Sequence, residues 1–215
     1  MSAMRLVLAS NNAKKLSELR ALLSGSGVEL VAQGELGIAE ADEPHLTFIE
    51  NALAKARHAA REAGGAAIAD DSGLCVDALG GAPGVVSAHF ADAGAETAAI
   101  ANREARRRVQ DAANNRLLLE RLAGAADRRC AFVSTLVALR HADDPEPLVA
   151  FGRWPGEVLA ETKGAGGFGY DPLVFVPALG ASVAELDAAT KNAHSHRARA
   201  AAQMRALLRE HWHLG

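Results

Sequence analysis

Apolar runs alternate along the chain with segments in which hydrophobic residues recur at helical spacing. Short apolar runs at 5–9, 28–33 and 66–69 predict three strands. Two helices are predicted from apolar residues three or four positions apart: Leu16, Leu19, Leu22 and Leu23 in the first, and Phe48, Ala52, Leu53, Ala56 and Ala60 in the second. The second helix is expected to stop at Gly64. This alternation of strands and helices is typical of an α/β protein.

The second half of the chain continues the alternation. A long helix is predicted over about 96–122, and we expect its arginines ("REARRR") to form a solvated face or a subunit contact. Residues 130–140 predict a long strand, with 147–153 as its hairpin partner across the turn "HADDPEP". The last predicted elements are a short strand at 173–176, capping-box spacing at 182–185 and an amphipathic helix that begins after Ser195. Hairpin-like and crossover-like connections both occur, so we expect a mixed sheet.

Composition narrows the class of protein. The 215 residues predict a single domain over 1–215, made of two lobes without a separable linker. The net charge of −3 argues against a general electrostatic grip on nucleic acid or on an anionic membrane. The two cysteines give neither a disulfide framework nor a zinc pattern, and no apolar stretch approaches the ~20 residues that span a bilayer. We therefore expect a cytoplasmic protein with no nucleic-acid or membrane partner.

The stretch "AIADDSGL" places two adjacent carboxylates at the end of an apolar run. Neighbouring residues of a strand point to opposite faces, so Asp70 and Asp71 cannot share one environment. One interpretation is a turn, in which an aspartate accepts main-chain N–H bonds and Gly73 supplies a permissive position. The other is a strand-end acid that holds a metal or activates a water molecule. Only the other stretches of the chain can decide between these two interpretations.

Two earlier stretches favour phosphate and metal chemistry. In "LASNNAKKLSEL" a polar turn joins a strand to a helix, whose N-terminus together with Lys14 and Lys15 could bind an anion. The alternative is an ordinary loop with asparagine turn bonds, and the spacing of a Walker P-loop is absent. In "DEPHLTFIENALAKA", Glu43 and Glu50 join the two aspartates as hard oxygen ligands. Such a set is sufficient for Mg²⁺, which needs one or two carboxylates beside substrate phosphates.

Two later stretches gather aromatic and cationic side chains. "GAGGFGYDP" contains G-x-G-x-x-G, but a strand-like segment follows it, so we reject a dinucleotide fingerprint. What remains is a glycine loop with two aromatic rings and an acid, suited to closing over a base, or else a tight loop with buried aromatics. "KNAHSHR" brings two cations and two imidazoles before a helix. His194 and His196 could suggest a metal site, but they lack a longer ligand pattern, and the alternative is a helix start that Ser195 caps.

Six ordered motifs resemble one known family. "SNNAKKLSEL", "TFIENALAKA", "ADDSGL", "GAPGVVSA", "GGFGYDP" and "SHR" span nearly the whole chain and are similar to the inosine triphosphate pyrophosphatase family, whose bacterial members are called dITP/XTP pyrophosphatases. The resemblance implies an α/β fold with an elongated mixed sheet flanked by helices, two lobes with a central active-site cleft, and a homodimer. It implies Mg²⁺-dependent cleavage of the purine nucleoside triphosphates dITP, ITP and XTP to the monophosphate and pyrophosphate.

The resemblance also assigns roles to matching positions. Asp71 matches the general base and, with Glu43, the metal ligands. The substrate-binding positions are, for the triphosphate, Ser10, Asn11, Asn12, Ala13, Lys14, Lys15 and Lys55; beside the catalytic acid, Ser72; for the nucleoside, Phe168, Gly169, Tyr170 and Asp171; and for the base, Lys191, His196 and Arg197. The alternatives are a nucleotide-binding module without catalysis and a septum-inhibitor-like (Maf-type) pyrophosphatase of other base specificity.

Overall fold

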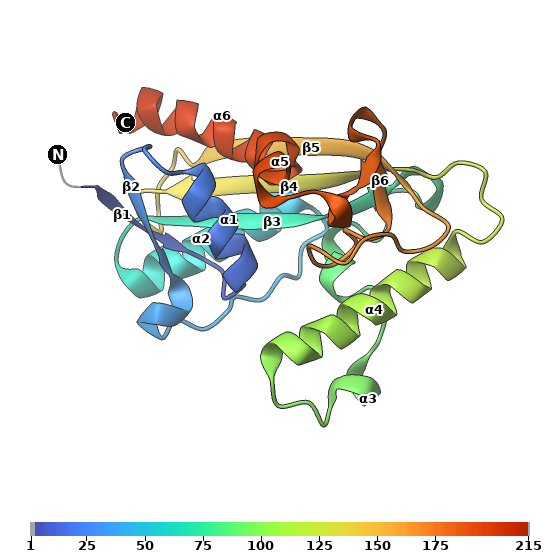
Figure 1. Cartoon of the computed structure of the whole chain (residues 1–215). Helices are drawn as coiled ribbons and strands as arrows, with labels where there is room; N and C mark the ends of the chain where they lie inside the picture. The colour runs from blue at the N-terminus through green and yellow to red at the C-terminus, as the bar shows by residue number, and fades with distance from the viewer. Residues whose placement is uncertain (1–2, 215) are drawn as a thin grey trace. The chain divides into compact units, whose positions relative to one another are not determined.

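The computed structural model describes residues 3–214 of the chain (Figure 1). Its strands are β1 (Met4–Leu8), β2 (Val28–Ala32), β3 (Ala67–Val76), β4 (Arg129–Leu139), β5 (Leu148–Val158), β6 (Val174–Val176) and β7 (Ala181–Ser182). Its α-helices are α1 (Ala13–Leu22), α2 (Phe48–Ala63), α3 (Gly94–Thr97), α4 (Arg103–Arg121), α5 (Ala188–His194) and α6 (His196–His211). None of the helices in this described part has the length and hydrophobicity that crossing a membrane requires.

The strands form one mixed sheet in the order β2-β1-β3-β4-β5-β6-β7. β1 runs parallel to both of its neighbours, with Leu6 opposite Leu30 of β2 and Val7 opposite Ala67 of β3. β6 is antiparallel to β5 and to β7. Parallel pairs follow from the helical crossovers of the first half, and the antiparallel pairs of β6 from connections without an α-helix in the second. The predicted mixed α/β sheet is confirmed.

The chain divides into two compact units. The first contains the described residues up to Asp71, then 134–153 and those from His194 onward, and the second contains 72–133 and 154–193. The strands β3, β4 and β5 each contribute residues to both units. The candidate site residues lie in both units. Asp71 is the last residue of the first unit's part of β3, and the glycine loop at 164–172 belongs to the second unit.

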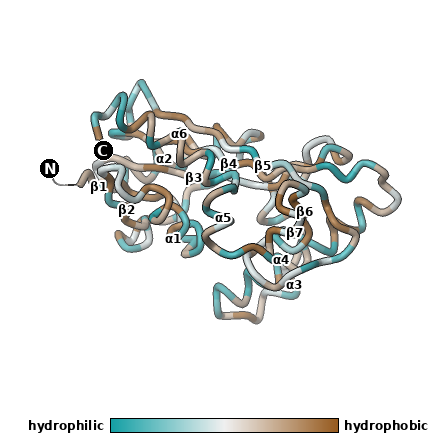
Figure 2. Tube along the Cα trace, turned by 45° about the horizontal axis from the view of Figure 1, so that its top comes forward, coloured by the Kyte–Doolittle hydropathy of each residue, from teal (hydrophilic) through white to brown (hydrophobic). Residues whose placement is uncertain are grey.

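In the first unit, the two faces of the sheet are covered by different helices. Leu6, Leu8 and Ile68 pack with residues of α1 and α6, whereas Val7, Ala67 and their neighbours pack with the alanine face of α2. The tube in Figure 2 changes repeatedly between brown and teal along α6, as expected for a helix with one apolar face. Because side chains alternate along a strand, Asp70 shares the face of Ile68 and Asp71 the face of Ala67. The adjacent acids therefore meet different helices.

In the second unit, α4 packs on a core that includes Leu74, Phe132 and Trp154. The prediction of one continuous helix over 96–122 is wrong at its start, because α3 ends at Thr97 and α4 begins at Arg103. The Asn102 side chain caps α4 by accepting a hydrogen bond from the main-chain N–H of Ala105 at 2.9 Å. An asparagine favours that capping position over a helix interior, which the charge pattern alone did not indicate.

Candidate active site

Asp71 lies at the end of the first unit's segment of β3 and faces α2. Its Oδ1 accepts a hydrogen bond from Lys55 Nζ at 2.8 Å, while its Oδ2 is buried and accepts none. Only 4% of the residue is exposed. Burial raises the pKa of Asp71 to about 6, although Lys55 and Lys15 act to lower it. The site thus holds a carboxylate with one oxygen positioned and the other available as a proton acceptor or ligand.

Lys55 joins the two acids predicted to bind metal. Its Nζ lies 2.8 Å from Asp71 Oδ1 and 3.2 Å from Glu43 Oε2, and it also donates to the main-chain oxygen of Asp70 at 3.2 Å. Burial acts to lower the pKa of Lys55, but Asp71 and Glu43 outweigh it and hold the pKa above its usual value. The ammonium therefore stays charged between two carboxylates, which brings Glu43 and Asp71 into one polar site.

This donor set suits a hard divalent cation. Within residues 3–214, no group of three or more His, Cys, Asp or Glu side chains is arranged to hold a metal. Mg²⁺ needs fewer protein ligands, because it takes one or two carboxylates together with water and substrate phosphates. The buried Oδ2 of Asp71 and the Glu43 carboxylate, 43% exposed at its side chain, provide such a pair.

Glu50, also considered as a ligand from the sequence, has a different role. Its Oε2 accepts a hydrogen bond from Thr47 Oγ1 at 2.6 Å, and its N–H donates to the same hydroxyl at 3.3 Å. These contacts cap the N-terminus of α2. The capping spacing of threonine and glutamate in "TFIE" could have indicated this role from the sequence.

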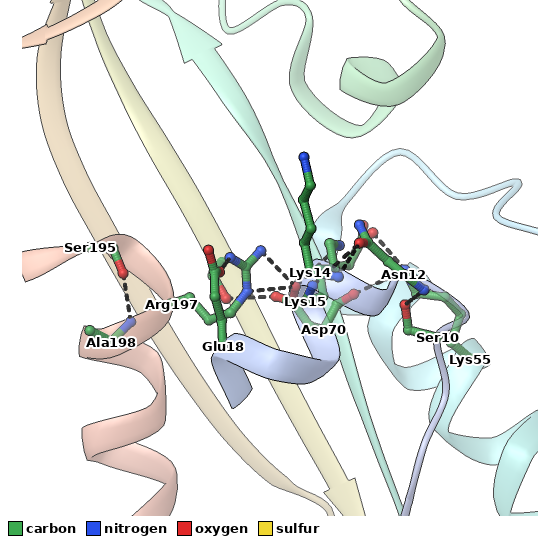
Figure 3. Close-up of polar contacts among 12 residues, drawn as sticks. Ser10, Asn12, Lys14, Lys15, Glu18, Lys55, Asp70, Ser195, Arg197 and Ala198 are labelled. Carbon is green, nitrogen blue, oxygen red and sulfur yellow. Dashed lines mark hydrogen bonds and ion pairs between the residues drawn. The ribbon is translucent and has the colours of Figure 1, made fainter. Parts of the chain in front are cut away.

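Asp70 lies in a separate cluster on the opposite face of the sheet. Its carboxylate accepts hydrogen bonds from Ser134 and Arg197 and pairs with Lys15 (Figure 3). Burial acts to raise the pKa of Asp70, but the charges of Arg197 and Lys15 outweigh it and hold the pKa far below its usual range. The two adjacent aspartates are thus opposite in character: Asp70 is firmly ionised and fully paired, and Asp71 is the more basic group.

The loop between β1 and α1 carries the positions predicted to cradle the triphosphate. Asn12 Oδ1 accepts the main-chain N–H groups of Lys14 at 3.1 Å and Lys15 at 3.3 Å, and Ser10 Oγ accepts the N–H of Asn12 at 3.1 Å. The local asparagine bonds considered for this loop are therefore present. They fix a helix N-terminus with two lysines in its first turn, where the helix dipole also favours an anion. Lys15 points into the Asp70 cluster, and Lys14 points away from it (Figure 3).

In the second unit, the glycine loop is organised by one acid. Asp171 Oδ2 accepts the main-chain N–H of Phe168 at 2.9 Å and lies 2.9 Å from Lys191 Nζ. The same ammonium lies 4.5 Å from the centroid of the Phe168 ring. Gly167 has φ +72°, and a Cβ there would overlap Asp171, so this position requires glycine. Phe168, Asp171 and Lys191 therefore form one compact group.

The expectation of two rings offered to a base is wrong for Tyr170. The residue is 4% exposed and packs in the core of the second unit. Its hydroxyl donates to the main-chain oxygen of Ser87 at 2.9 Å, and burial holds its pKa above the usual value. A buried tyrosine needs a partner for its hydroxyl, and this loop supplies it from the core side. Phe168, which is half-buried, is the ring of the pair that can stack on a ligand.

The three positions assigned to the base are distributed over both units. Lys191 belongs to the second, whereas His196 and Arg197 begin α6 in the first. Ser195 caps this helix through the N–H of Ala198, as predicted. Arg197 is 1% exposed, and its guanidinium binds the carboxylates of Asp70 and Glu18. Ser72, the position beside the catalytic acid, is half-buried at the start of the second unit.

Several contributing residues were missed from the sequence. They are Glu18 and Ser134 in the Asp70 cluster, and Asp111 and Asn115 of α4, which bind the N–H and the oxygen of Gly169 at 2.9 and 3.1 Å. Ser134 could have been found, because it is polar at a strand position that shares its face with Leu136 and Ala138. Asp111 and Asn115 are one helical turn apart on α4, a helix whose charged side was expected to be a solvated face or a subunit contact.

Comparisons with known proteins show which family the chain resembles. A model of the Ham1 family matches residues 6–207. A protein of Methylibium petroleiphilum named dITP/XTP pyrophosphatase is 70% identical over 209 residues, covering 97% of this chain and 99% of that protein. A Burkholderia pseudomallei protein of the same name is 58% identical over 206 residues, covering 96% and 94%. The solved structure of a HAM1 protein from Coxiella burnetii aligns with a TM-score of 0.81 at 39% identity, covering 96% and 99%.

The mixed sheet flanked by helices defines an α/β protein, and its first unit carries a polar site in which Lys55 pairs with two carboxylates. With the family model matched across nearly its whole length, the chain belongs to the Ham1 family. The predicted family resemblance is confirmed, since the relatives bear the name expected for its bacterial members.

Proposed function

We propose that this chain hydrolyses non-standard purine nucleoside triphosphates (dITP, ITP and XTP) to the monophosphate and pyrophosphate, and so removes them from the nucleotide pool. The observation that carries the proposal is the buried Asp71 Oδ2, which accepts no hydrogen bond beside a lysine-held Oδ1. The name of a relative that is 70% identical supports the substrate class.

Asp71 acts as the general base in this proposal. The oxygen of a water molecule bonds to the α-phosphorus, the bond from that phosphorus to the bridging oxygen breaks, and pyrophosphate leaves. The proton of the water passes to Asp71, whose pKa of about 6 suits a base that works near neutral pH. The Lys55 ammonium keeps Asp71 oriented through its 2.8 Å contact. Lys15 and Lys55 counter the charge of the triphosphate, the kind of stabilisation on which phosphoryl chemistry depends most.

Glu43 and Asp71 are the residues that would hold the metal, which we propose to be Mg²⁺. When bound, it supplies charge neutralisation on the phosphate oxygens and on the pyrophosphate that leaves. Lys55 contacts both carboxylates and so keeps them together as a pair.

Base recognition is proposed to rest on stacking and on a fixed donor. The Phe168 ring offers a face to any base, so it adds affinity without selecting among them. Lys191 can only donate, which suits the 6-oxygen of hypoxanthine or xanthine and not the 6-amino group of adenine. His196 and Arg197 keep the base-binding role that the family resemblance gives them as a prediction. For Arg197 that role requires exchange of a carboxylate partner, since its guanidinium binds Asp70 and Glu18.

Pyrophosphate release from a substrate panel tests the function. ITP, dITP and XTP should be cleaved with Mg²⁺ and not with chelator, ATP far more slowly, and Asp71→Asn should abolish release. Binding of ITP without any pyrophosphate release would instead indicate a nucleotide-binding module. Preferential cleavage of pyrimidine nucleotides would indicate the Maf-type alternative.

Assembly and location complete the proposal. We propose a homodimer that acts in the cytoplasm, without nucleic-acid or membrane partners. Light scattering on the purified protein should give twice the mass of the chain, and a mass equal to one chain would exclude the dimer.

A further inference from the structure

We propose that Asp70 is a positioning residue, which holds the Lys15 ammonium in place for the triphosphate without touching the substrate itself. The inference rests on the proposed function, because it concerns how that site binds phosphate. It assigns a role to Asp70, the aspartate of the adjacent pair that takes no part in the proposed hydrolysis step.

The contacts of Asp70 show how completely its carboxylate is engaged. Oδ1 accepts the hydroxyl of Ser134 at 2.7 Å. Oδ2 accepts Arg197 Nη2 at 3.0 Å and Nε at 3.2 Å, and lies 3.1 Å from Lys15 Nζ. The side chain is fully buried, and its contacts come from three elements, β4, α6 and α1. A carboxylate bound in this way has little freedom of orientation.

The contacts form a closed ring of alternating charge that begins and ends on α1. Glu18 of α1 binds Arg197 of α6, Arg197 binds Asp70 of β3, and Asp70 binds Lys15, back on α1 (Figure 3). Lys15 and Glu18 are three positions apart, so they lie on the same side of this helix. The ring therefore fixes both the helix and the direction of the Lys15 side chain.

Lys15 is the member of the ring that can reach a ligand. Its side chain is 17% exposed, whereas those of Asp70 and Arg197 are at most 2% exposed. The Glu18 side chain is 18% exposed, but its negative charge would repel a phosphate. An ammonium has three donor hydrogens, so Lys15 can bind Asp70 and a phosphate oxygen together. Holding a flexible lysine in its bound direction lowers the entropy lost on binding. Loss of Asp70 should therefore weaken phosphate binding more than it slows the chemical step.

The test compares Asp70→Asn with Asp144→Asn by kinetics and by a base-free inhibitor. Asp144 belongs to the same unit and is as buried as Asp70. Its carboxylate accepts the main-chain N–H groups of Arg140 and Glu146 and is not a member of the ring. For Asp70→Asn, the KM for ITP and the Ki of tripolyphosphate should both rise about 10- to 100-fold, the change expected for loss of a charge-assisted contact. The value of kcat should change less, and Asp144→Asn should leave Ki and KM unaltered.

A milder variant guards against misfolding of Asp70→Asn. Glu18→Gln loosens the ring at its most accessible member and should raise the Ki of tripolyphosphate in the same direction, by a smaller factor. If folded Asp70→Asn or Glu18→Gln shows a lower melting temperature with an unchanged Ki, the ring is purely structural and the inference is overturned. Direct calorimetric binding of tripolyphosphate to the wild type keeps the two proposals apart. Binding without pyrophosphate release from ITP would refute the function, and the calorimetric Kd of tripolyphosphate for Asp70→Asn against that for the wild type would then test Asp70.

Discussion

Replacing Asp71 with asparagine should remove activity and at the same time stabilise the fold. The substitution keeps the size of the side chain and removes its charge and its basicity. Turnover should fall by about 10²–10⁴-fold, the usual contribution of a general base. Stability should rise, because the structure holds an ionisable group in a buried position where one of its oxygens has no partner.

The size of the stabilisation follows from the pKa of Asp71. The value of about 6 lies roughly 2 units above the usual 3.8. Each unit corresponds to about 1.4 kcal/mol, so ionised Asp71 costs the fold on the order of 3 kcal/mol near neutral pH. An amide contacts Lys55 less strongly than a carboxylate does, which reduces the expected gain to about 1–3 kcal/mol. For a chain of this length, that is a melting temperature higher by about 2–10 °C.

The pH dependence has a defined sign. A raised pKa stabilises the fold only where the carboxyl is protonated, so the wild type should match Asp71→Asn below about pH 4. Between pH 4 and 6 the unfolded chain loses its proton first, and the wild type should lose stability relative to the variant. Above pH 6 the gap should stay constant.

The assay is thermal or urea unfolding in EDTA, since a bound cation would favour the ionised form and close the gap. Asp70→Asn is the matched control, because it breaks a buried ion pair and should be destabilised by about 3–5 kcal/mol. If Asp71→Asn melts below the wild type at pH 8, or if the gap does not depend on pH, the reasoning about its burial is refuted. Normal turnover by the folded variant would remove Asp71 from the mechanism.

Three further changes test separate parts of the structure. Glu43→Gln should raise the Mg²⁺ concentration needed for half-maximal rate, because a neutral ligand replaces a charged one; an unchanged metal curve would exclude Glu43 as a ligand. Tyr170→Phe removes the hydrogen bond to Ser87 and should cost about 1 kcal/mol in urea unfolding. The KM for ITP should not change, and a large rise in KM would indicate that Tyr170 contacts the substrate after all. Gly152→Ala should destabilise the protein by about 1–3 kcal/mol, because a Cβ there would overlap the main chain of His196; melting at the wild-type temperature would contradict that packing.

The strands and the separation of the two aspartates could be predicted because they depend on local periodicity. Apolar runs predicted β1 and the start of β3, and the two-residue repeat required Asp70 and Asp71 to face different ways. The end of β3 was predicted wrongly, because the strand continues through both aspartates and Gly73 to Val76 instead of turning or ending there. The N-caps at Thr47 and Ser195 likewise follow from residue type and spacing.

Contacts that join distant segments could not be predicted in the same way. Arg197 and Asp70 are 127 positions apart, and nothing local to either indicates that they pair. The burial of Tyr170 depends on a main-chain oxygen at Ser87, far away in the sequence, so its ring could not be distinguished from that of Phe168. The break between α3 and α4 was missed because Asn102 competes locally with a helical pattern that continues on both sides.

The closed ring through α1, β3 and α6 also constrains how this chain can change during evolution. Loss of any one of its four charged members removes an ion-pair partner from a neighbouring charge, and for the Asp70–Arg197 pair both charges are buried. Single substitutions at these positions should therefore be removed by selection, whereas paired exchanges that restore neutrality can persist. We expect Glu18, Arg197, Asp70 and Lys15 to be inherited as one unit among relatives, and a substitution at one position to be tolerated only where another position has changed with it.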